Sequence, residues 1–437
     1  MRYAIYTLGC KVNQYETQAL ETELLRRGHT LVPFGDEADA YIINTCTVTA
    51  VSDRKSRNAI RRAKKRNPAA VVAVCGCYAQ TAPEDVAALG VDLVSGTGDR
   101  LGFLNEVERL SGLVRAEAEL VPEMLVDNIM THRSFEQLPA GGLEGRTRAM
   151  LKIQDGCVNF CSYCIIPYAR GPVRSLPLAD CVRQARALEG AGYREIVLTG
   201  IEISSWGRDL EGRPGLIEAI EAICQALSPD TRVRLGSLEP RTITPDFCAR
   251  AAALPNLCPH FHLSLQSGCD ATLARMNRKY DSARYYDSVR FLRGVYDRPG
   301  ITTDLITGFP GETEAEFQAT LAFLQQCAFS AMHIFPYSRR PGTPAASMPD
   351  QVPRAVKEER AHRAAALAAR MEGDYLASFA GETIPVLFED RQGGLWRGHT
   401  DRYCEVSVPA QENLHNRLVP VTVTGVEGSR LTGALPG

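Results

Sequence analysis

Three cysteines within eight residues mark the middle of the chain. They are Cys157, Cys161 and Cys164, in a C-x3-C-x2-C arrangement. A cubane iron–sulfur cluster takes four ligands, one for each iron, so three thiolates leave one iron open. An open iron chelates a small ligand that offers an amine and a carboxylate, as S-adenosylmethionine (SAM) does. An electron from the cluster then cleaves SAM to a 5′-deoxyadenosyl radical.

This triplet resembles the radical SAM signature, including the aromatic Tyr163 directly before the last cysteine. The alternatives are a zinc knuckle and three unrelated core cysteines. Zinc sites usually need a fourth cysteine or histidine at ligand spacing, and residues 133–259 contain no histidine. We therefore interpret the triplet as a site of radical chemistry.

Composition excludes several classes of protein. The chain has 437 residues, 45% of them hydrophobic, which suits two or three domains with their own cores. No apolar run approaches the roughly 20 residues of a membrane span, and residues 1–16 lack the apolar stretch of a signal peptide, so we expect a cytoplasmic protein. Fourteen cysteines then favour metal or redox chemistry over disulfides. The net charge of −2 leaves any RNA site to a local patch.

Three more cysteines follow the strands predicted in residues 1–135. Buried strands are expected at residues 2–8, 40–45 and 70–75, and the residues just past their ends are Cys10, Cys46 and Cys77. A helix expected from about Asn13 would bury Tyr15, Leu20, Leu24 and Leu25. Strands alternating with helices predict a parallel sheet, whose carboxyl edge binds ligands.

A second cluster is therefore predicted at this edge. Cys75 complicates the choice of ligands, because side chains alternate along a strand and Cys75 could face the same way as Cys77. Geometry alone does not decide between them, although Cys77 is better placed on the turn.

Residues 54–66 are strongly basic. Their cations are Arg54, Lys55, Arg57, Arg61, Arg62, Lys64, Lys65 and Arg66. One interpretation is a solvated helix face, and the other is contact with RNA phosphates, since no acid is interleaved. Both stay open.

After a Gly-rich linker at 136–148, residues 149–350 alternate strands and helices. Strands are expected within 149–157, 194–200, 231–240, 260–268, 300–310 and 330–338. Six such units predict a partial (β/α)6 barrel with its site at the carboxyl ends of the strands. The candidates for SAM binding there are Gly200, Glu202, Ser237, Gln266 and Asp304. Arg170 and Arg174 are candidates for the SAM carboxylate or RNA phosphate, or for ion pairs with structural acids.

The pattern changes again near the end of the chain. A helix is expected over 351–380, and residues 381–437 read as a small antiparallel β-barrel of the kind that often binds oligonucleotides. Its candidate RNA contacts are Trp396, Arg397, His399, Arg402 and Tyr403. The alternative is a packing module.

Over its whole length the chain resembles the methylthiotransferases. The matching segments are LGCKVNQYE, NTCTV and GCYAQ, together with the triplet. The resemblance implies a methylthiotransferase domain (1–135), a radical SAM domain (149–350) and a TRAM domain (381–437). It also implies an auxiliary [4Fe-4S] cluster on Cys10, Cys46 and Cys77, which makes Cys75 an extra thiol, and a SAM-binding [4Fe-4S] cluster on Cys157, Cys161 and Cys164.

The same resemblance implies that two SAM molecules are used per turnover, one to methylate a sulfur and one to be cleaved. The implied partners are a tRNA, a low-potential electron donor and a sulfur donor, with no membrane.

The segment LTGIEISSWG (198–207) resembles the threonylcarbamoyladenosine subfamily, whereas the isopentenyladenosine type reads LTGQNVNSYG; Trp206, where Tyr is usual, is a departure. The expected reaction is methylthiolation of carbon 2 of N6-threonylcarbamoyladenosine at tRNA position 37. The alternatives are the isopentenyladenosine enzyme, the ribosomal-protein aspartate enzyme and, in a different class, an iron–sulfur electron carrier with an RNA-binding tail.

Overall fold

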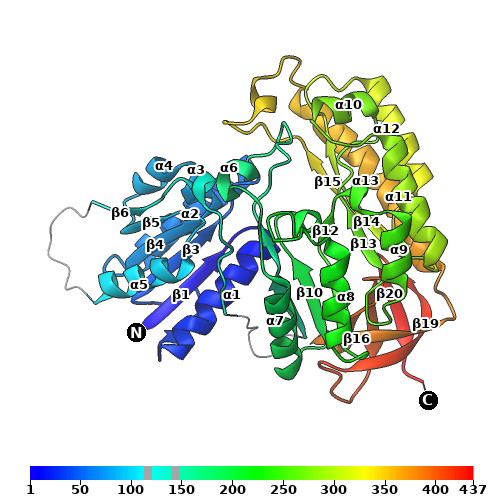
Figure 1. Ribbon diagram of the computed structural model, residues 1–437, viewed down its shortest axis with the longest axis horizontal. Helices are drawn as coiled ribbons and strands as arrows, with labels where there is room; N and C mark the ends of the chain where they lie inside the picture. Colours follow the sequence, from blue (N-terminus) through cyan, green and yellow to red (C-terminus); the bar gives the residue numbers. More distant parts are fainter. Residues whose placement is uncertain (113–120, 140–146, 437) are drawn as a thin grey trace.

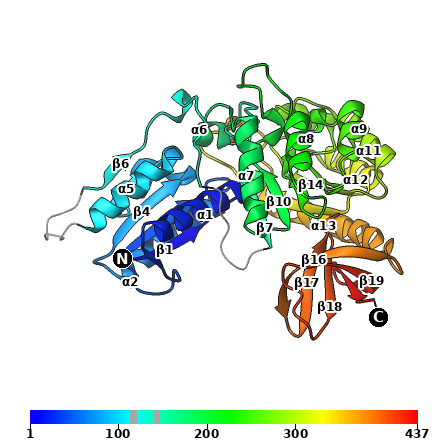
Figure 2. The same ribbon diagram turned by 60° about the horizontal axis from the view of Figure 1, so that its bottom comes forward.

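The computed structural model describes residues 1–112, 121–139 and 147–436. Three bodies follow one another along the chain: an α/β unit, a larger central α/β unit, and a small β-barrel beneath the central unit (Figures 1 and 2). Most of the predicted linker, 140–146, lies outside the described residues. Within the described ranges, no helix has both the length and the apolar character needed to cross a membrane.

The first unit contains a six-stranded parallel sheet, as predicted, in the order β2-β1-β3-β4-β5-β6. The strands are β1 (Arg2–Thr7), β2 (Thr30–Leu31), β3 (Ala40–Thr45), β4 (Val71–Gly76), β5 (Leu93–Ser95) and β6 (Glu123–Leu125). The helices are α1 (Lys11–Arg26), α2 (Ala50–Arg66), α3 (Cys77–Thr81), α4 (Pro83–Ala87) and α5 (Arg100–Ser111). Every residue of β3 and β4 is buried, because helices cover both faces of a parallel sheet.

Two details of the predicted first helix are corrected. It begins at Lys11 rather than near Asn13, so the chain turns into the helix directly after Cys10. Tyr15, Leu20 and Leu24 are buried as expected, but Leu25 is 52% exposed. Leu25 directly follows Leu24, and a step of about 100° around the helix axis carries it off the buried face.

The central unit is built from parallel strands in two sheets, β11-β10-β7 and β12-β13-β14-β15. The strands are β7 (Arg148–Lys152), β10 (Glu195–Thr199), β11 (Arg232–Leu235), β12 (Ser237–Leu238), β13 (His260–Leu263), β14 (Gly300–Thr307) and β15 (Ala331–Pro336). The major helices are α7 (Leu178–Gly190), α8 (Leu216–Ala226), α9 (Pro245–Ala252), α11 (Ser282–Val295) and α12 (Glu314–Cys327). Only Gly236 separates β11 from β12, so one sheet leads directly into the other.

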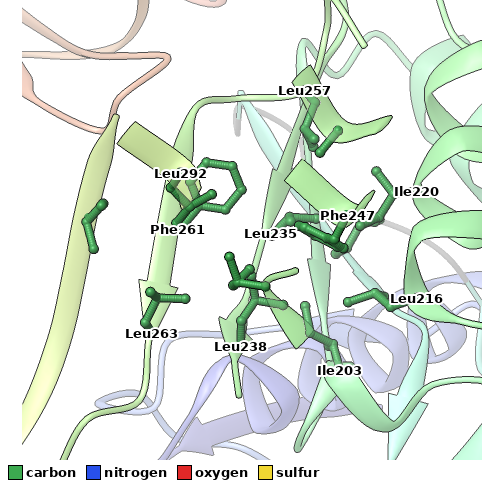
Figure 3. Close-up of a cluster of buried hydrophobic side chains, with 14 of the residues drawn as sticks. Ile203, Leu216, Ile220, Leu235, Leu238, Phe247, Leu257, Phe261, Leu263 and Leu292 are labelled. Atoms are coloured by element: carbon green, nitrogen blue, oxygen red, sulfur yellow. The ribbon is translucent and has the colours of Figure 1, made fainter. Parts of the chain in front are cut away.

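Alternate strand residues form the core between these strands and their helices. Figure 3 shows strand residues Leu235, Phe261 and Leu263 near helix residues Ile220, Phe247 and Leu292. Because successive side chains point to opposite faces, the residues between them, such as Arg234 and His262, face the other side of the sheet.

Shorter elements complete this unit. They are β8 (Gln154–Asp155), β9 (Arg174–Ser175), α6 (Ile166–Arg170), α10 (Asp270–Arg275) and the 3₁₀ turns η2 (Ile203–Ser205), η3 (Pro240–Thr242) and η4 (Pro344–Ser347). The 3₁₀ turn η1 (Ile129–Thr131) lies in the chain that follows β6 of the first unit. The long helix α13 (Arg354–Ala377) then connects the central unit to the terminal barrel, as Figure 2 shows.

The terminal strands close into a barrel in the order β16-β17-β18-β20-β19. They are β16 (Thr383–Gln392), β17 (Leu395–Thr400), β18 (Glu405–Pro409), β19 (Leu418–Glu427) and β20 (Arg430–Ala434). The predicted antiparallel pairing is found except between β18 and β20, which run parallel.

The barrel docks on the central strand β11 through two arginines. Arg232 donates hydrogen bonds to the carbonyls of His399 (3.0 Å) and Pro385 (2.8 Å). Arg234 donates to the carbonyls of Asp401 (2.7 Å) and Thr400 (3.1 Å). Charge-assisted hydrogen bonds from these side chains to backbone carbonyls fix the barrel against the central unit.

The suggested RNA-stacking role of Trp396 is wrong. Its side chain is 7% exposed and packs in the barrel core with Phe388 and Val406. The burial of β17 alternates residue by residue, and Trp396 falls on the inward phase.

We expect Trp396→Ala to lower the free energy of unfolding of the terminal barrel by about 3–5 kcal/mol, the usual cost of emptying a core position of an aromatic ring. Hydrogen exchange of the barrel amides measures this loss. Arg397→Ala is the matched control, because the neighbouring side chain faces outward. A Trp396→Ala protein with unchanged barrel protection but weaker RNA binding would restore the stacking role.

Candidate functional site

The first cysteine set lies at the carboxyl edge of the first sheet. Cys10, Cys46 and Cys77 follow β1, β3 and β4, which are neighbours in that sheet. Gly9 has a φ of +121°, and a Cβ placed on it would lie 3.1 Å from the Cβ of Cys46. Only glycine allows this close approach. Burial, with smaller contributions from Cys10 and Cys46, raises the pKa of the Cys77 thiol to about 12.

The structure separates Cys75 from this set. Cys75 packs with Phe103 and Leu104 in the apolar cluster beneath α1 and α5, whereas Cys77 begins α3. Gly76 makes the turn between them with a φ of +97°, and a Cβ placed on it would lie 2.5 Å from the carbonyl oxygen of Thr45.

The second cysteine set occupies the loop between β8 and α6. The amide of Cys157 donates to the carbonyl of Gly171 (3.0 Å), and the amide of Cys164 donates to the carbonyl of Cys161 (2.9 Å). The amide of Ser162 donates to the carbonyl of Met276 (3.0 Å). Burial raises the pKa of both Cys157 and Cys164 to about 12. Backbone hydrogen bonds therefore hold the loop that carries these thiols.

Each set contains one sulfur that accepts a hydrogen bond from an arginine. Arg170 Nε lies 3.3 Å from Cys77 Sγ, and Arg278 Nη1 lies 3.2 Å from Cys161 Sγ. A cationic donor stabilises a buried thiolate, and hydrogen bonds to sulfur tune iron–sulfur clusters.

Each set offers three thiols, the ligand type that iron–sulfur clusters take in proteins. In a cubane each thiolate binds a different iron. With three cysteines in each set, one iron of each cluster would remain open.

A buried ion network joins the two sets. Glu16 of α1 is fully buried and accepts hydrogen bonds from Arg100 Nη2 (2.9 Å), Lys152 Nζ (3.2 Å) and Arg170 Nη2 (3.1 Å). Arg170 Nη2 also donates to Asn13 Oδ1 at 2.7 Å. Arg170 ends α6, which closely follows the second set, and α6 packs against α3, which carries Cys77 (Figure 1). The guanidinium of Arg170 thus contacts the first cysteine set, while its backbone belongs to the helix that follows the second set.

The charges in this network depend on one another. Burial by itself would raise the pKa of Glu16, but Arg100, Arg170 and Lys152 outweigh burial and hold the pKa well below its ordinary value. Asp155, which lies 2.6 Å from Lys152 Nζ, has its pKa lowered to about 2 because nearby cations outweigh its burial. Both carboxylates are therefore ionised at neutral pH.

Glu202 follows the strand β10 and reaches the second set. Its amide donates to Gln154 Oε1 at 2.8 Å, which fixes the backbone just after Gly200. Glu202 Oε1 is buried and has no hydrogen-bond partner among the described residues. Burial raises the pKa of Glu202 to about 7, and its charge acts on the nearby Cys157. A buried carboxylate with an open oxygen is suited to receive a cationic ligand.

Of the remaining predicted SAM contacts, Gln266 and Asp304 lie together, and Ser237 lies apart from them. The amide of Gln266 donates to the carbonyl of Asp304 (2.9 Å), and Asp304 Oδ2 lies 3.4 Å from His262 Nε2, so these residues meet within the second central sheet. Ser237 is exposed at the start of β12.

The two arginines after the triplet form ion pairs with structural acids. Arg174 is buried 3.5 Å from Asp155 Oδ2, and Arg170 is held by Glu16. Of the two roles left open for them, the structure favours the structural one.

The basic residues of α2 are mostly at the surface. Arg61, Arg62 and Lys65 are exposed. Arg57 donates to Tyr78 Oη (3.1 Å), and Lys64 donates to the carbonyls of Leu89 (3.3 Å) and Gly90. Among the described residues, none of these five has an ion pair with an acid.

Two candidate RNA contacts in the terminal barrel are engaged within the protein. Arg402 Nη2 donates to the carbonyl of Asp297 (3.1 Å) and Arg402 Nε to that of Arg298 (3.1 Å), at the seam with the central unit. Arg397 donates to Gln392 Oε1 at 2.6 Å.

Sequence reasoning missed several residues that position the site. Asn13 and Glu16 lie within the segment LGCKVNQYE, three and six residues after Cys10, and only that proximity could have indicated them. Arg278 and Arg340 carry no sequence signal. Arg340 binds Asp53 and Thr47 and so ties the loop after β15 to the first unit.

Comparison with known proteins agrees with this geometry. Residues 2–96 match the model of an uncharacterised protein family, UPF0004, and residues 151–324 match the radical SAM superfamily. The threonylcarbamoyladenosine tRNA methylthiotransferase MtaB of Bacillus subtilis is 39% identical over 96% of this chain and 93% of its own. The tRNA-2-methylthio-N(6)-dimethylallyladenosine synthase of Pelotomaculum thermopropionicum is 33% identical over 99% of this chain and 97% of its own.

Solved structures show a similar fold. The radical SAM methyltransferase TsrM of Kitasatospora setae superposes with a TM-score of 0.55 over 90% of this chain and 79% of its own, at 17% identity.

We expect Glu16→Gln to lower the free energy of unfolding by about 3–5 kcal/mol at pH 7, because it removes the buried counter-charge that Arg100, Lys152 and Arg170 share and leaves, among the described residues, only Asp155 beside the last two. Since folding depresses the pKa of Glu16, its stabilisation is complete above its unfolded pKa of about 4.3 and is lost as the pH falls below that value. Urea unfolding at pH 7 and in acid measures both effects.

Glu358→Gln is the control, because its partner Arg354 is exposed and such a pair contributes about 0–1 kcal/mol. Equal losses in the two variants would show that the network does not stabilise the docking of the domains.

Proposed function

The chain belongs to the radical SAM methylthiotransferase family, and from that premise we propose that it installs a methylthio group on carbon 2 of N6-threonylcarbamoyladenosine at position 37 of tRNA. The product is 2-methylthio-N6-threonylcarbamoyladenosine. The observation that carries this proposal is the pair of cysteine sets on either side of the seam between the first two units, where Arg170, from the helix after the second set, donates to Cys77 of the first. Relatives whose names specify this substrate support the choice within the family.

The reaction needs radical chemistry. Carbon 2 of adenine bears an unactivated hydrogen, and general-base catalysis, worth typically about 10²–10⁴-fold, does not remove a proton this inert. When bound, a [4Fe-4S] cluster on Cys157, Cys161 and Cys164 supplies the electron that cleaves SAM, and one on Cys10, Cys46 and Cys77 presents the sulfur. Two SAM molecules, a low-potential electron donor and a sulfur donor complete the requirements.

The protein's own side chains hold these groups in place. Arg278 and Arg170 donate to one sulfur of each set and offset the thiolate charge. Glu202, with its open buried oxygen beside Cys157, receives the ammonium group of SAM, which would return it to the charged form. Gly200, which follows the same strand β10 and has no side chain, leaves space there for SAM.

Further along the strands, Gln266, Asp304 and Ser237 are proposed to contact the rest of SAM. Arg174 supports the loop through Asp155.

We assign the three bodies to a methylthiotransferase domain (1–135), a radical SAM domain (149–350) and, after the helix of 351–380, a TRAM domain (381–437). In this assignment the two central sheets form one partial (β/α)6 barrel, and the reaction takes place in the cytoplasm. The target base must leave its stack to reach the cysteine sets, which is easiest in an anticodon loop.

RNA binding is proposed for α2 and the terminal barrel. The exposed cations of α2 contact phosphates without reading sequence. Because Trp396 is buried and both Arg397 and Arg402 are engaged within the protein, the exposed Tyr403 remains the barrel candidate.

Nucleoside analysis tests the reaction. A deletion strain should lack 2-methylthio-N6-threonylcarbamoyladenosine, and mass spectrometry of its tRNA should find the nucleoside restored by the wild-type chain and by Cys75→Ala. Cys77→Ala and Cys157→Ala should not restore it, because each removes one cluster ligand. Loss of the isopentenyl nucleoside or of a ribosomal-protein modification instead would reassign the substrate, and protein that binds no SAM would be an electron carrier.

A salt titration tests the basic helix. Neutralising Arg61, Arg62, Lys64 and Lys65 should weaken tRNA binding at low salt, because phosphates then keep their counterions. It should also flatten the plot of log affinity against log salt by roughly 0.7–0.9 for each phosphate that the variant no longer neutralises. The weakening should be similar across tRNA sequences.

The control neutralises Arg183, Arg290 and Arg354, exposed cations of the central unit and α13. A helix variant with the wild-type salt slope would return α2 to a solvated charged face.

A further inference from the structure

A cavity of about 680 Å³ lies where the three units meet. Lys11 of α1 borders it on one side, Arg148 and Arg234 of the central strands on another, and His399 and Tyr403 of the terminal barrel on a third. Among the described residues that line it, Met150 and Val197 are the only aliphatic side chains. Most of the lining side chains therefore carry a polar or charged group that a polar ligand can contact.

Most charges on the cavity wall are already paired within the protein. Arg234 makes two hydrogen bonds to Glu195, at 2.7 and 2.8 Å. Arg148 donates to Glu389 at 2.8 Å. Arg397 donates to Gln392 and lies 3.8 Å from Glu405. These arginines hold the protein's own elements together and are not available to a ligand.

Two acids of the terminal barrel are also engaged. Glu389 Oε1 lies 2.6 Å from His399 Nδ1, and Asp390 accepts from Gln392 at 2.9 Å.

Lys11 differs from the other cations. It is exposed, lines the cavity, and has no hydrogen bond or ion pair with another residue in the part of the chain that the structure describes. It directly follows Cys10, and the first turn of the 16-residue helix α1 contains no acid. Its ammonium group therefore stands open at the cavity wall, one residue along the chain from Cys10.

We propose that this cavity receives the N6 substituent of the substrate and that Lys11 binds its carboxylate. The inference rests on the proposed function, in which carbon 2 of the adenine faces the first cysteine set. Carbon 2 and N6 lie on the same Watson–Crick edge, with N1 between them. A base that presents carbon 2 near Cys10 thus carries its N6 group past the next residue, Lys11.

This placement makes Lys11 a specificity-determining residue. A threonylcarbamoyl group brings a carboxylate that pairs with Lys11, together with a hydroxyl and amides that face a mostly polar set of lining side chains. An isopentenyl group would leave the lysine unpaired. The difference in affinity comes from one charge-assisted contact that only the first substituent makes.

The test measures equilibrium binding of the reconstituted full-length protein to three anticodon stem-loops. They share one sequence and carry N6-threonylcarbamoyladenosine, N6-isopentenyladenosine or adenosine at position 37. Wild type should bind the first most tightly. Lys11→Met, which keeps most of the length of the side chain and removes the charge, should lose about tenfold or more of the preference for the first RNA over the third.

Three further observations belong to the expected result. The affinity of Lys11→Met for the adenosine RNA should stay within about twofold of wild type, its iron content should be unchanged, and Lys11→Arg should keep most of the preference. Lys65→Met, on the exposed face of α2, should instead weaken all three RNAs equally, since phosphate contacts do not sense position 37.

Different failures have different meanings. A Lys11→Met protein that keeps the wild-type preference, that weakens all three RNAs equally, or that loses iron would overturn the role of Lys11 while leaving the reaction in place. A wild type that prefers the isopentenyl RNA and modifies it, but not the threonylcarbamoyl RNA, would overturn the proposed function itself.

Discussion

The docking of the first two units depends on the burial of one carboxylate. Glu16 has no exposure to solvent, and an unpaired charge in that position would cost several kcal/mol. Its partners come from three separate places: Arg100 in its own unit, Lys152 on the first central strand, and Arg170 after the second cysteine set. The network is complete only when the units are docked, so the ion that is most costly to bury also fixes the relative position of the two cysteine sets.

The same docking creates the environment that the chemistry requires. Arg170 reaches from this network to Cys77, so a shift of the seam would alter the donor to one set and the loop of the other together. At the other seam, Arg234 holds the terminal barrel through two carbonyls. Buried arginines therefore define how the units meet around the cavity, and the open side chain of Lys11 stands out because the charges around it are paired.

The elements that carry the cysteines were predictable because their signals are local. Buried parallel strands read as continuous apolar runs, and β3 spans Ala40–Thr45 as expected from its sequence. The role of Glu16 was not predictable, because its partners Lys152 and Arg170 lie 136 and 154 residues away along the chain and leave no periodic pattern.

Trp396 illustrates a second kind of limit on sequence reasoning. A shift of one residue along a strand moves a side chain from the surface to the core, and composition does not reveal that phase. The separation of Cys75 from Cys77 depended on the same detail, since the turn at Gly76 places one thiol in the apolar cluster and the other at the sheet edge.

Discrimination between tRNA substrates follows from how the cavity is built. A hydrophobic pocket distinguishes alkyl groups by only about 1–3 kcal/mol, whereas a site that pairs with a polar group rejects an analogue lacking it far more strongly, because its own polar group is left without a partner. Isopentenyl and threonylcarbamoyl substituents sit on the same atom of the same base, so shape near carbon 2 separates them poorly. In the proposed arrangement, a lysine placed one residue after a cysteine of the first set makes that distinction without altering the thiols themselves.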